Sequence, residues 1–140
     1  MAKIAQGLGV SISIFFEEDN RDRKGCAVNC KNNRKQVIRR GTKIGFTYYS
    51  LNSIKSRHMM EAFILKYPIV PREPSILFDH PGEEFLLVLR GEMNLVYGKE
   101  KIWLDTGDAI HFDPSTPQRG QNAGKKESEC LVVIVDKQIS

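Results

Sequence analysis

The chain has 140 residues, of which 41% are hydrophobic and 27% are charged, and its formal net charge is +4. This length supports one packed core, and no apolar run approaches the roughly 18 residues that span a bilayer, so the composition excludes a membrane-spanning helix and favours a soluble domain. The three cysteines are an odd number without C-x-x-C spacing, which indicates reduced thiols and a cytoplasmic location.

The first residues of the chain fit two kinds of secondary structure. Gly9 stands where a left-handed cap would end one short helix, and Ser11 could cap a second. The apolar residues between positions 10 and 16 recur at helical spacing, but they also alternate with the period of a strand. Periodicity alone therefore leaves helix and strand open for this segment.

Basic residues are concentrated before position 45. A solvated pair of charged strands explains such a cluster, and a surface for nucleic acid or an acidic partner is the alternative. The cluster consists of Arg21, Arg23, Lys24, Lys31, Arg34, Lys35, Arg39, Arg40 and Lys43.

From about residue 24 onward, short β-prone runs are divided by turn residues, which is typical of antiparallel β structure. We expect His111 to face outward and Cys130 to lie in a core strand. Strands are predicted near 25–29, 35–39, 43–50, 58–66, 75–79, 84–90, 92–98, 101–104, 109–112, 118–121 and 129–136. So many short strands hide their edges in a double-sheet jelly roll, which predicts an all-β fold.

Two motifs lie on these predicted strands. His80 stands four residues before Glu84, and Gly91 ends the apolar run that follows. Further along, Gly107 opens a turn, a strand and a proline-braced loop that lead to Asn122. This arrangement resembles the two motifs of the cupin family. The resemblance implies a double-stranded β-helix, or jelly-roll barrel, that holds one small ligand.

Two of the four metal ligands that the cupin motifs imply are replaced in this chain. Phe78 stands at the position of the first histidine and Gln118 at that of the last, whereas His80 and Glu84 match the other two. Transition-metal sites usually need three imidazole, carboxylate or thiolate ligands. We therefore expect no metal, no other cofactor and no catalytic residue. The expected ligand-binding residues are Phe78, His80, Glu84 and Gln118.

His80 and Glu84 are expected either to anchor a ligand or to satisfy each other by a hydrogen bond inside the barrel. If Glu84 points inward with Leu86 and Val88, its carboxylate lies in apolar surroundings and requires a cation. The ammonium group of a ligand is one hypothesis for that cation.

A narrower resemblance covers almost the whole chain. Residues 4–17 are similar to the end of a lambda-repressor-like, XRE-type helix-turn-helix domain, and the rest is similar to the cupin sensor of one class of bacterial transcriptional regulators. This resemblance implies a helical N-terminal segment, with a helix-turn-helix remnant and linker at 1–20 and a cupin domain at 21–140. The recognition helix would lie upstream, so contact with DNA is expected only through that upstream domain.

The expected function is therefore a homodimeric effector-binding domain. It would sense a small-molecule effector, a small polar metabolite, and pass the state of its pocket to DNA binding, with no membrane partner. The alternative is a metal-dependent cupin enzyme of the dioxygenase or isomerase type. A third possibility is a dimerisation module whose pocket is filled by its own side chains.

Overall fold

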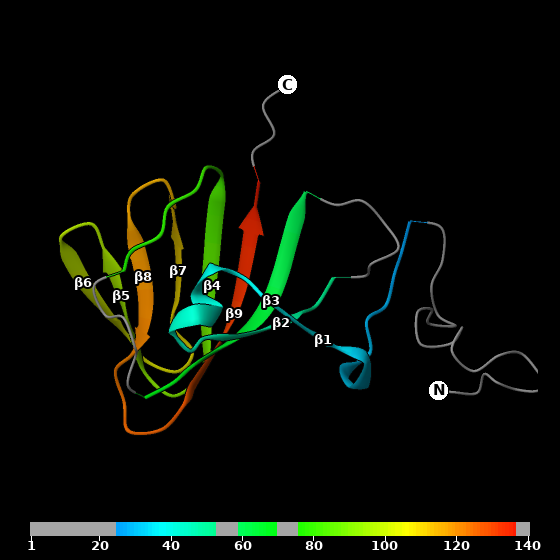
Figure 1. The fold of residues 1–140 in the computed structure, drawn as a ribbon, viewed down its shortest axis with the longest axis horizontal. Coiled ribbons are helices and arrows are strands. Elements are labelled where there is room, and N and C mark those ends of the chain that lie inside the picture. Colours follow the sequence, from blue (N-terminus) through cyan, green and yellow to red (C-terminus); the bar gives the residue numbers. More distant parts are fainter. Residues whose placement is uncertain (1–24, 53–58, 70–75, 137–140) are drawn as a thin grey trace, which may run out of the picture.

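The computed structural model describes residues 25–52, 59–69 and 76–136, and the regular secondary structure within them is β strands with two short 3-10 helices (Figure 1). The elements are η3 (Lys31–Asn33), β1 (Lys35–Val37), η4 (Arg40–Ile44), β2 (Thr47–Ser50), β3 (Met60–Tyr67), β4 (Glu83–Arg90), β5 (Met93–Tyr97), β6 (Glu100–Leu104), β7 (Ala109–Phe112), β8 (Gln118–Asn122) and β9 (Ser128–Val135). The predicted all-β class is confirmed. The predicted helical segment and the boundary at residue 20 lie outside the described residues. No helix in the described part is long and apolar enough to cross a membrane.

Three of the predicted strands are wrong or incomplete. Between residues 25 and 29 only Cys26 takes part in a β-bridge, because this segment is a loop that Asn29 ties to the Asn52 carbonyl oxygen at 3.0 Å. The strand predicted from residue 43 begins at 47, because η4 occupies 40–44 and ends at Gly45 with a φ of 101°. The strand predicted at 75–79 is reduced, in its described part, to one isolated bridge.

The strands form two antiparallel sheets (Figure 1). The six-stranded sheet has the order β1-β2-β3-β9-β4-β7, and the three-stranded sheet has the order β6-β5-β8. The last strand, β9, pairs with β3 on one side and β4 on the other, so it lies between two strands that follow each other in the sequence. Alternation along each strand then decides which side chains face the second sheet.

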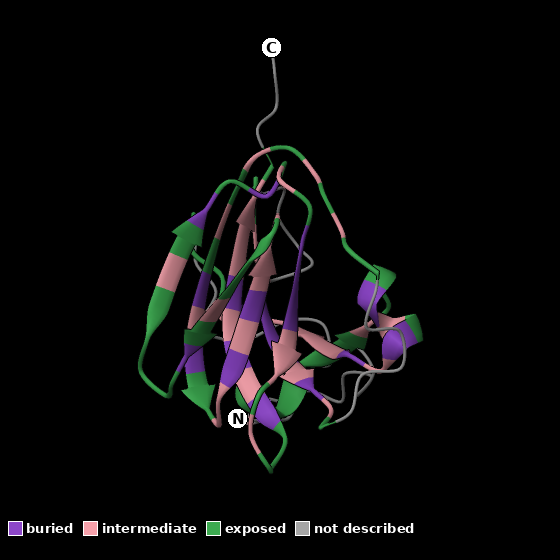
Figure 2. Ribbon diagram, turned by 90° about the vertical axis from the view of Figure 1, so that its left-hand side faces the viewer, coloured by how far each residue is buried: buried purple, intermediate pink, exposed green. Residues whose placement is uncertain are grey.

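The core lies between the two sheets. The six-stranded sheet contributes Leu86 and Val88 from β4 and Val132 from β9, and the three-stranded sheet contributes Met93 and Leu95 from β5, all at most 2% exposed. In Figure 2 the buried segments gather on the central strands, whereas the turns are mostly exposed. Cys130 belongs to this core and His111 is exposed, which confirms both predictions.

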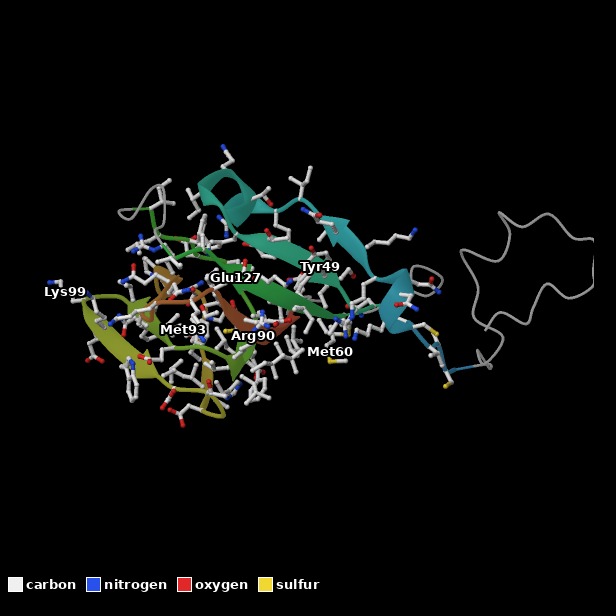
Figure 3. All side chains as sticks on the ribbon, turned by 90° about the horizontal axis from the view of Figure 1, so that it is seen from below. Tyr49, Met60, Arg90, Met93, Lys99 and Glu127 are labelled. Atoms are coloured by element: carbon white, nitrogen blue, oxygen red, sulfur yellow. The ribbon has the colours of Figure 1, made fainter. Side chains whose placement is uncertain are left out.

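A tight corner joins the two sheets where β4 ends. Gly91 has a φ of 82°, a conformation that other residues rarely adopt, and a side chain there would lie 2.9 Å from the Cβ atom of Ser128. The preceding residue, Arg90, reaches across to the β9 side, 3.3 Å from Glu129 and 3.9 Å from Glu127 (Figure 3). This corner sends the chain from the six-stranded sheet to the three-stranded sheet.

Candidate functional site

A cavity of about 260 Å³ lies inside the barrel, beside the core. Its wall is built from β2, β3, β8 and β9, from the start of β4, and from residues 38–41. The four residues that the sequence assigned to a ligand, Phe78, His80, Glu84 and Gln118, all line this cavity. The structure therefore brings together residues that are spread over two separate motifs.

Strand β4 and the loop before it place the charged pair of the site. Glu84 is the second residue of β4 and shares its inward face with Leu86 and Val88, as predicted. The loop residue His80 is fixed by a backbone hydrogen bond from its N–H to the Pro114 carbonyl oxygen at 3.0 Å. Its Nε2 then lies 3.0 Å from Glu84 Oε1. The histidine side chain is 24% exposed and the carboxylate is 11% exposed, so water screens this pair only partly.

Both ring nitrogens of His80 face hydrogen-bond acceptors. Nε2 faces the Glu84 carboxylate, and Nδ1 lies 3.0 Å from the Pro81 carbonyl oxygen. A neutral imidazole carries only one N–H, whereas an imidazolium can donate to both acceptors. The hydrogen bond with Glu84 accordingly raises the pKa of His80 above its ordinary value, against the opposing effect of burial. His80 thus supplies the cation that the Glu84 carboxylate requires, and no ligand ammonium group is needed for that purpose.

The two positions at which the cupin motifs would carry histidines are direct neighbours. Phe78 and Gln118 form an antiparallel bridge, with Phe78 N–H donating to the Gln118 carbonyl oxygen at 2.8 Å and Gln118 N–H donating to the Phe78 carbonyl oxygen at 2.9 Å. The Gln118 residue is only 6% exposed. Its side-chain amide has no hydrogen-bond partner among the described residues, although it lines the cavity.

These residues do not fit a transition-metal site. The Phe78 ring offers no donor atom, and Gln118 offers an amide oxygen, a weak ligand for iron, zinc or manganese. The remaining two residues, His80 and Glu84, use their facing atoms on each other. Within the described part of the chain, no three His, Cys, Asp or Glu side chains come together as possible metal ligands. The site offers hydrogen-bonding groups and charge to a ligand instead.

Two arginines of the basic cluster, which the sequence left open as solvated strands or as a surface for nucleic acid or an acidic partner, stand at the cavity wall. The guanidinium of Arg39 lies 4.7 Å from the centre of the Phe63 ring, and that of Arg40 lies 5.1 Å from the centre of the Phe78 ring. Such cation–π contacts hold each guanidinium over an aromatic ring. The sequence feature that could have indicated these residues is the basic cluster before residue 45. Nothing in that cluster distinguished Arg39 and Arg40 from its other members.

Gly41 lets this arginine-bearing segment approach the barrel closely. A Cβ atom at this position would lie 2.3 Å from the Tyr48 hydroxyl oxygen, so no larger residue fits without displacing the tyrosine. Burial raises the pKa of Tyr48 above its ordinary value, and the adjacent Gly41 backbone partly opposes this shift. The hydroxyl therefore stays protonated at neutral pH.

Two more buried polar residues line the cavity and were not anticipated. Arg119, on β8, is 3% exposed, and its guanidinium donates to the Ile76 carbonyl oxygen at 2.9 Å and to the Gln121 side chain. Burial lowers its pKa. Tyr67, at the end of β3, is also 3% exposed, and burial raises the pKa of its hydroxyl well above the ordinary value.

Not every histidine of this region belongs to the site. His111 Nε2 lies 2.8 Å from Glu83 Oε1 on the outer face of the six-stranded sheet, where the two side chains are 65% and 52% exposed. This is the same type of histidine–glutamate pair as His80–Glu84, but it is exposed to solvent. The third histidine, His58, lies outside the described residues.

The two packed sheets and the cavity between them define a double-stranded β-helix, the jelly roll of the cupins. A family model for the cupin domain matches residues 69–134, which contain both motifs. No curated protein matches the chain significantly.

Solved structures share this fold at low sequence identity. The hydroxypropylphosphonic acid epoxidase from S. wedmorenis, in complex with fosfomycin, is 20% identical with a TM-score of 0.66, and the match covers 84% of this chain and 62% of the epoxidase. The polyketide cyclase RemF from Streptomyces resistomycificus is 17% identical with a TM-score of 0.64, and the match covers 79% of this chain and 80% of the cyclase.

A third structure with this fold is an HTH_3 family transcriptional regulator from Vibrio cholerae, 15% identical with a TM-score of 0.54. The match covers 66% of this chain and 52% of the regulator. This chain thus spans less than two thirds of the length of the epoxidase and about half that of the regulator. Enzymes and a regulator share the fold, so the fold alone does not choose between these functions.

Proposed function

We propose that this chain is the effector-binding domain of a bacterial transcriptional regulator, in which a small polar metabolite in the cavity controls DNA binding by a helix-turn-helix segment. The observation that carries the proposal is the composition of the cavity wall. His80, Glu84 and Gln118 offer hydrogen bonds there, while Phe78 and Gln118 stand where a metal-dependent cupin carries ligands. Such a wall suits binding without metal chemistry. The Vibrio cholerae regulator shows that proteins of this class use the fold.

The proposed mechanism is a shift between two conformations. A ligand changes their populations only if it binds one of them more tightly than the other. The segment of residues 38–41 lines the cavity and lies between β1 and β2, closer in sequence to the N-terminal region than any other part of the wall. A ligand that contacts residues 38–41 in one conformation would favour that conformation. The change in this segment would then reach the proposed DNA-binding segment.

A metal-dependent enzyme is the second candidate, because the chain superposes better on the epoxidase than on the regulator. One of the epoxidase structures is an Fe(II) form, with a TM-score of 0.67 against 0.54 for the regulator. An enzyme of this kind would hold about one metal ion per chain.

The experiment that separates the two candidates is metal loading followed by elemental analysis. Untagged protein is incubated with iron, manganese or zinc under reducing conditions, desalted and analysed by mass spectrometry. We expect below about a tenth of an equivalent in the wild type, because only two of its residues offer suitable ligands. The double variant Phe78→His, Gln118→His restores the missing imidazoles and is the matched positive control. One equivalent in the wild type would overturn the sensor proposal and favour the enzyme.

We also propose that the domain is a homodimer that pairs through the outer face of the six-stranded sheet. The pairing registers place apolar residues side by side there, with Ala62, Val133 and Phe85 in one row and Ile64, Leu131 and Leu87 in the next. Phe85 is 36% exposed. Ile64 is buried at 6% exposure, and the other members of the two rows are partly exposed. Apolar surface of this kind on the outer face of a sheet can mark an interface. The first row ends at His111, whose partner Glu83 is 2.8 Å away, so its charge is offset within the chain. A second copy of the chain presents the same apolar residues, and a two-fold contact would pack them against each other.

Light scattering coupled to size-exclusion chromatography tests the dimer. We expect a mass of twice 15.9 kDa for the wild type and a monomer for Phe85→Lys. Trp103→Lys, which changes an exposed residue of the other sheet, should remain dimeric. A monomeric wild type would refute the proposal.

A further inference from the structure

The charges around the cavity decide which class of ligand it favours. Among the described residues, Glu84 is the carboxylate that lines the cavity, and His80 holds it in a hydrogen-bonded ion pair at 3.0 Å. Arg39 has a carboxylate partner, Glu61, at 3.5 Å. Both pairs are close to neutral, so neither provides an unsatisfied negative charge for a cationic ligand.

Arg40 is different, because no carboxylate of the described residues lies within ion-pair distance of its guanidinium. Its guanidinium donates to the Asp79 carbonyl oxygen at 2.9 Å and lies over the Phe78 ring, and both partners are uncharged. A guanidinium carries five N–H donors, so these contacts leave several free for a ligand. The Phe78 and Asp79 contacts hold the guanidinium at the wall of the cavity and reduce the entropy that a ligand would have to remove.

Deeper in the cavity, two uncharged groups can complete the binding of a polar ligand. Gln118 is 6% exposed and Tyr67 is 3% exposed, and neither the Gln118 amide nor the Tyr67 hydroxyl has a hydrogen-bond partner among the described residues. Both side chains line the cavity, so a ligand or a water molecule there can satisfy their hydrogen-bonding groups. The hydroxyl is held protonated by burial and is therefore available as a donor.

From this arrangement we infer that the cavity binds a small organic anion, whose carboxylate or phosphonate group is held by Arg40 at the wall and whose remaining polar atoms reach Gln118 and Tyr67. The inference rests on the proposed function and specifies its ligand class. Arginine suits this role because its fork of donors matches the paired oxygens of both groups. The volume of about 260 Å³ is just below the usual range of about 300–1,000 Å³ for ligand pockets, which limits the anion to a small metabolite.

Isothermal titration calorimetry at low ionic strength tests the inference with three probes of similar size. Succinate carries carboxylates, methylphosphonate carries a phosphonate, and putrescine carries two ammonium groups. We expect at least one of the two anions to bind and putrescine not to bind. The anion that binds identifies which of the two acid groups the cavity prefers.

The variants assign the binding to Arg40. Arg40→Gln should weaken the binding of the anion at least tenfold, whereas Arg40→Lys, which keeps the charge and loses the fork, should weaken it less. Lys99→Gln removes the same charge from the exposed turn between β5 and β6 and should leave the affinity unchanged. Urea unfolding of each variant verifies that it is folded.

Three outcomes would overturn the inference. Failure of both anions to bind at millimolar concentrations would exclude this ligand class. Equal weakening of anion binding by Arg40→Gln and Lys99→Gln would show that only the net charge of the protein matters. Binding of putrescine alone would show that the cavity takes cations, while the effector-binding function would stand. Loss of that function is recognised separately, by one equivalent of metal in the loading experiment.

Discussion

The two histidine–glutamate pairs of this protein allow the effect of burial on an ion pair to be measured within one strand. Glu84 and Glu83 are consecutive residues of β4, and each lies within 3.0 Å of a histidine nitrogen. The first pair faces the cavity, with its carboxylate 11% exposed, and the second faces solvent, with its carboxylate 52% exposed. The perturbation is Glu84→Gln, and Glu83→Gln is the matched control.

The expected magnitudes follow from the surroundings of each pair. A hydrogen bond to a charged group contributes about 1.5–3 kcal/mol when it is shielded from water. Because glutamine keeps a carbonyl oxygen that can accept from His80, we expect Glu84→Gln to lower the free energy of unfolding by about 1.5 kcal/mol, the lower end of that range. Exposed pairs contribute about 0–1 kcal/mol, so Glu83→Gln should have an effect near the bottom of that range.

The pH dependence has a defined sign. The pKa of His80 is raised in the folded state above the ordinary value of 6.5, chiefly by the hydrogen bond with Glu84. The pair therefore stabilises the protein fully below pH 6.5, and this contribution is lost as the pH rises through the folded-state pKa. Arg40, which also faces His80, lowers the pKa and limits the width of this window. The difference between the wild type and Glu84→Gln should shrink with increasing pH.

Urea denaturation followed by tryptophan fluorescence, at a series of pH values from 5.5 to about 9, measures both effects. The wild type and the two variants are compared at each pH. An equal loss of stability in Glu83→Gln and Glu84→Gln would refute the argument from burial. A Glu84→Gln effect that does not change with pH would show that the charge on His80 is not what stabilises the pair.

Two further predictions concern the interior. A Cβ atom at position 120 would lie 2.6 Å from the Tyr67 hydroxyl, so Gly120→Ala should destabilise the protein by about 1–3 kcal/mol in urea denaturation. Gly124→Ala, whose nearest contact would be at 3.6 Å, should cost much less, and equal costs would contradict the packing argument. Burial raises the pKa of the Cys130 thiol to about 12, so iodoacetamide at pH 8 should alkylate the exposed Cys26 and leave Cys130 unmodified until the protein unfolds. Peptide mapping checks this, and rapid labelling of native Cys130 would show that its strand opens readily.

Much of the barrel could be predicted from the sequence because strand alternation is a local property. The strands from residue 83 onward lie within one residue of their predicted bounds, and the strand at 109–112 has the bounds predicted. The inward face of Glu84, Leu86 and Val88 followed from the same period of two. The resemblance of two motifs to the cupins assigned Phe78, His80, Glu84 and Gln118 to one site, and all four line the cavity.

The region before residue 50 was predicted less well, because its segments have little periodicity and depend on distant contacts. Residues 25–29 are held as a loop by the contact of Asn29 with Asn52. The 3-10 helix η4 replaces the start of a predicted strand, and Arg39 and Arg40 reach the cavity only because Gly41 lets their segment approach Tyr48. A cluster of charged residues in the sequence normally indicates a solvated surface. It does not show which of these residues the fold will place against aromatic rings.

The class of fold could thus be predicted from local alternation, and the residues at the centre of the barrel from the resemblance of two motifs to those of the cupins. The distribution of the charges could be read only from the three-dimensional contacts. The tertiary structure pairs His80 with Glu84, places Arg40 over Phe78 and leaves Gln118 facing the cavity. These contacts join segments far apart in the chain, and no local pattern specifies which charges will meet.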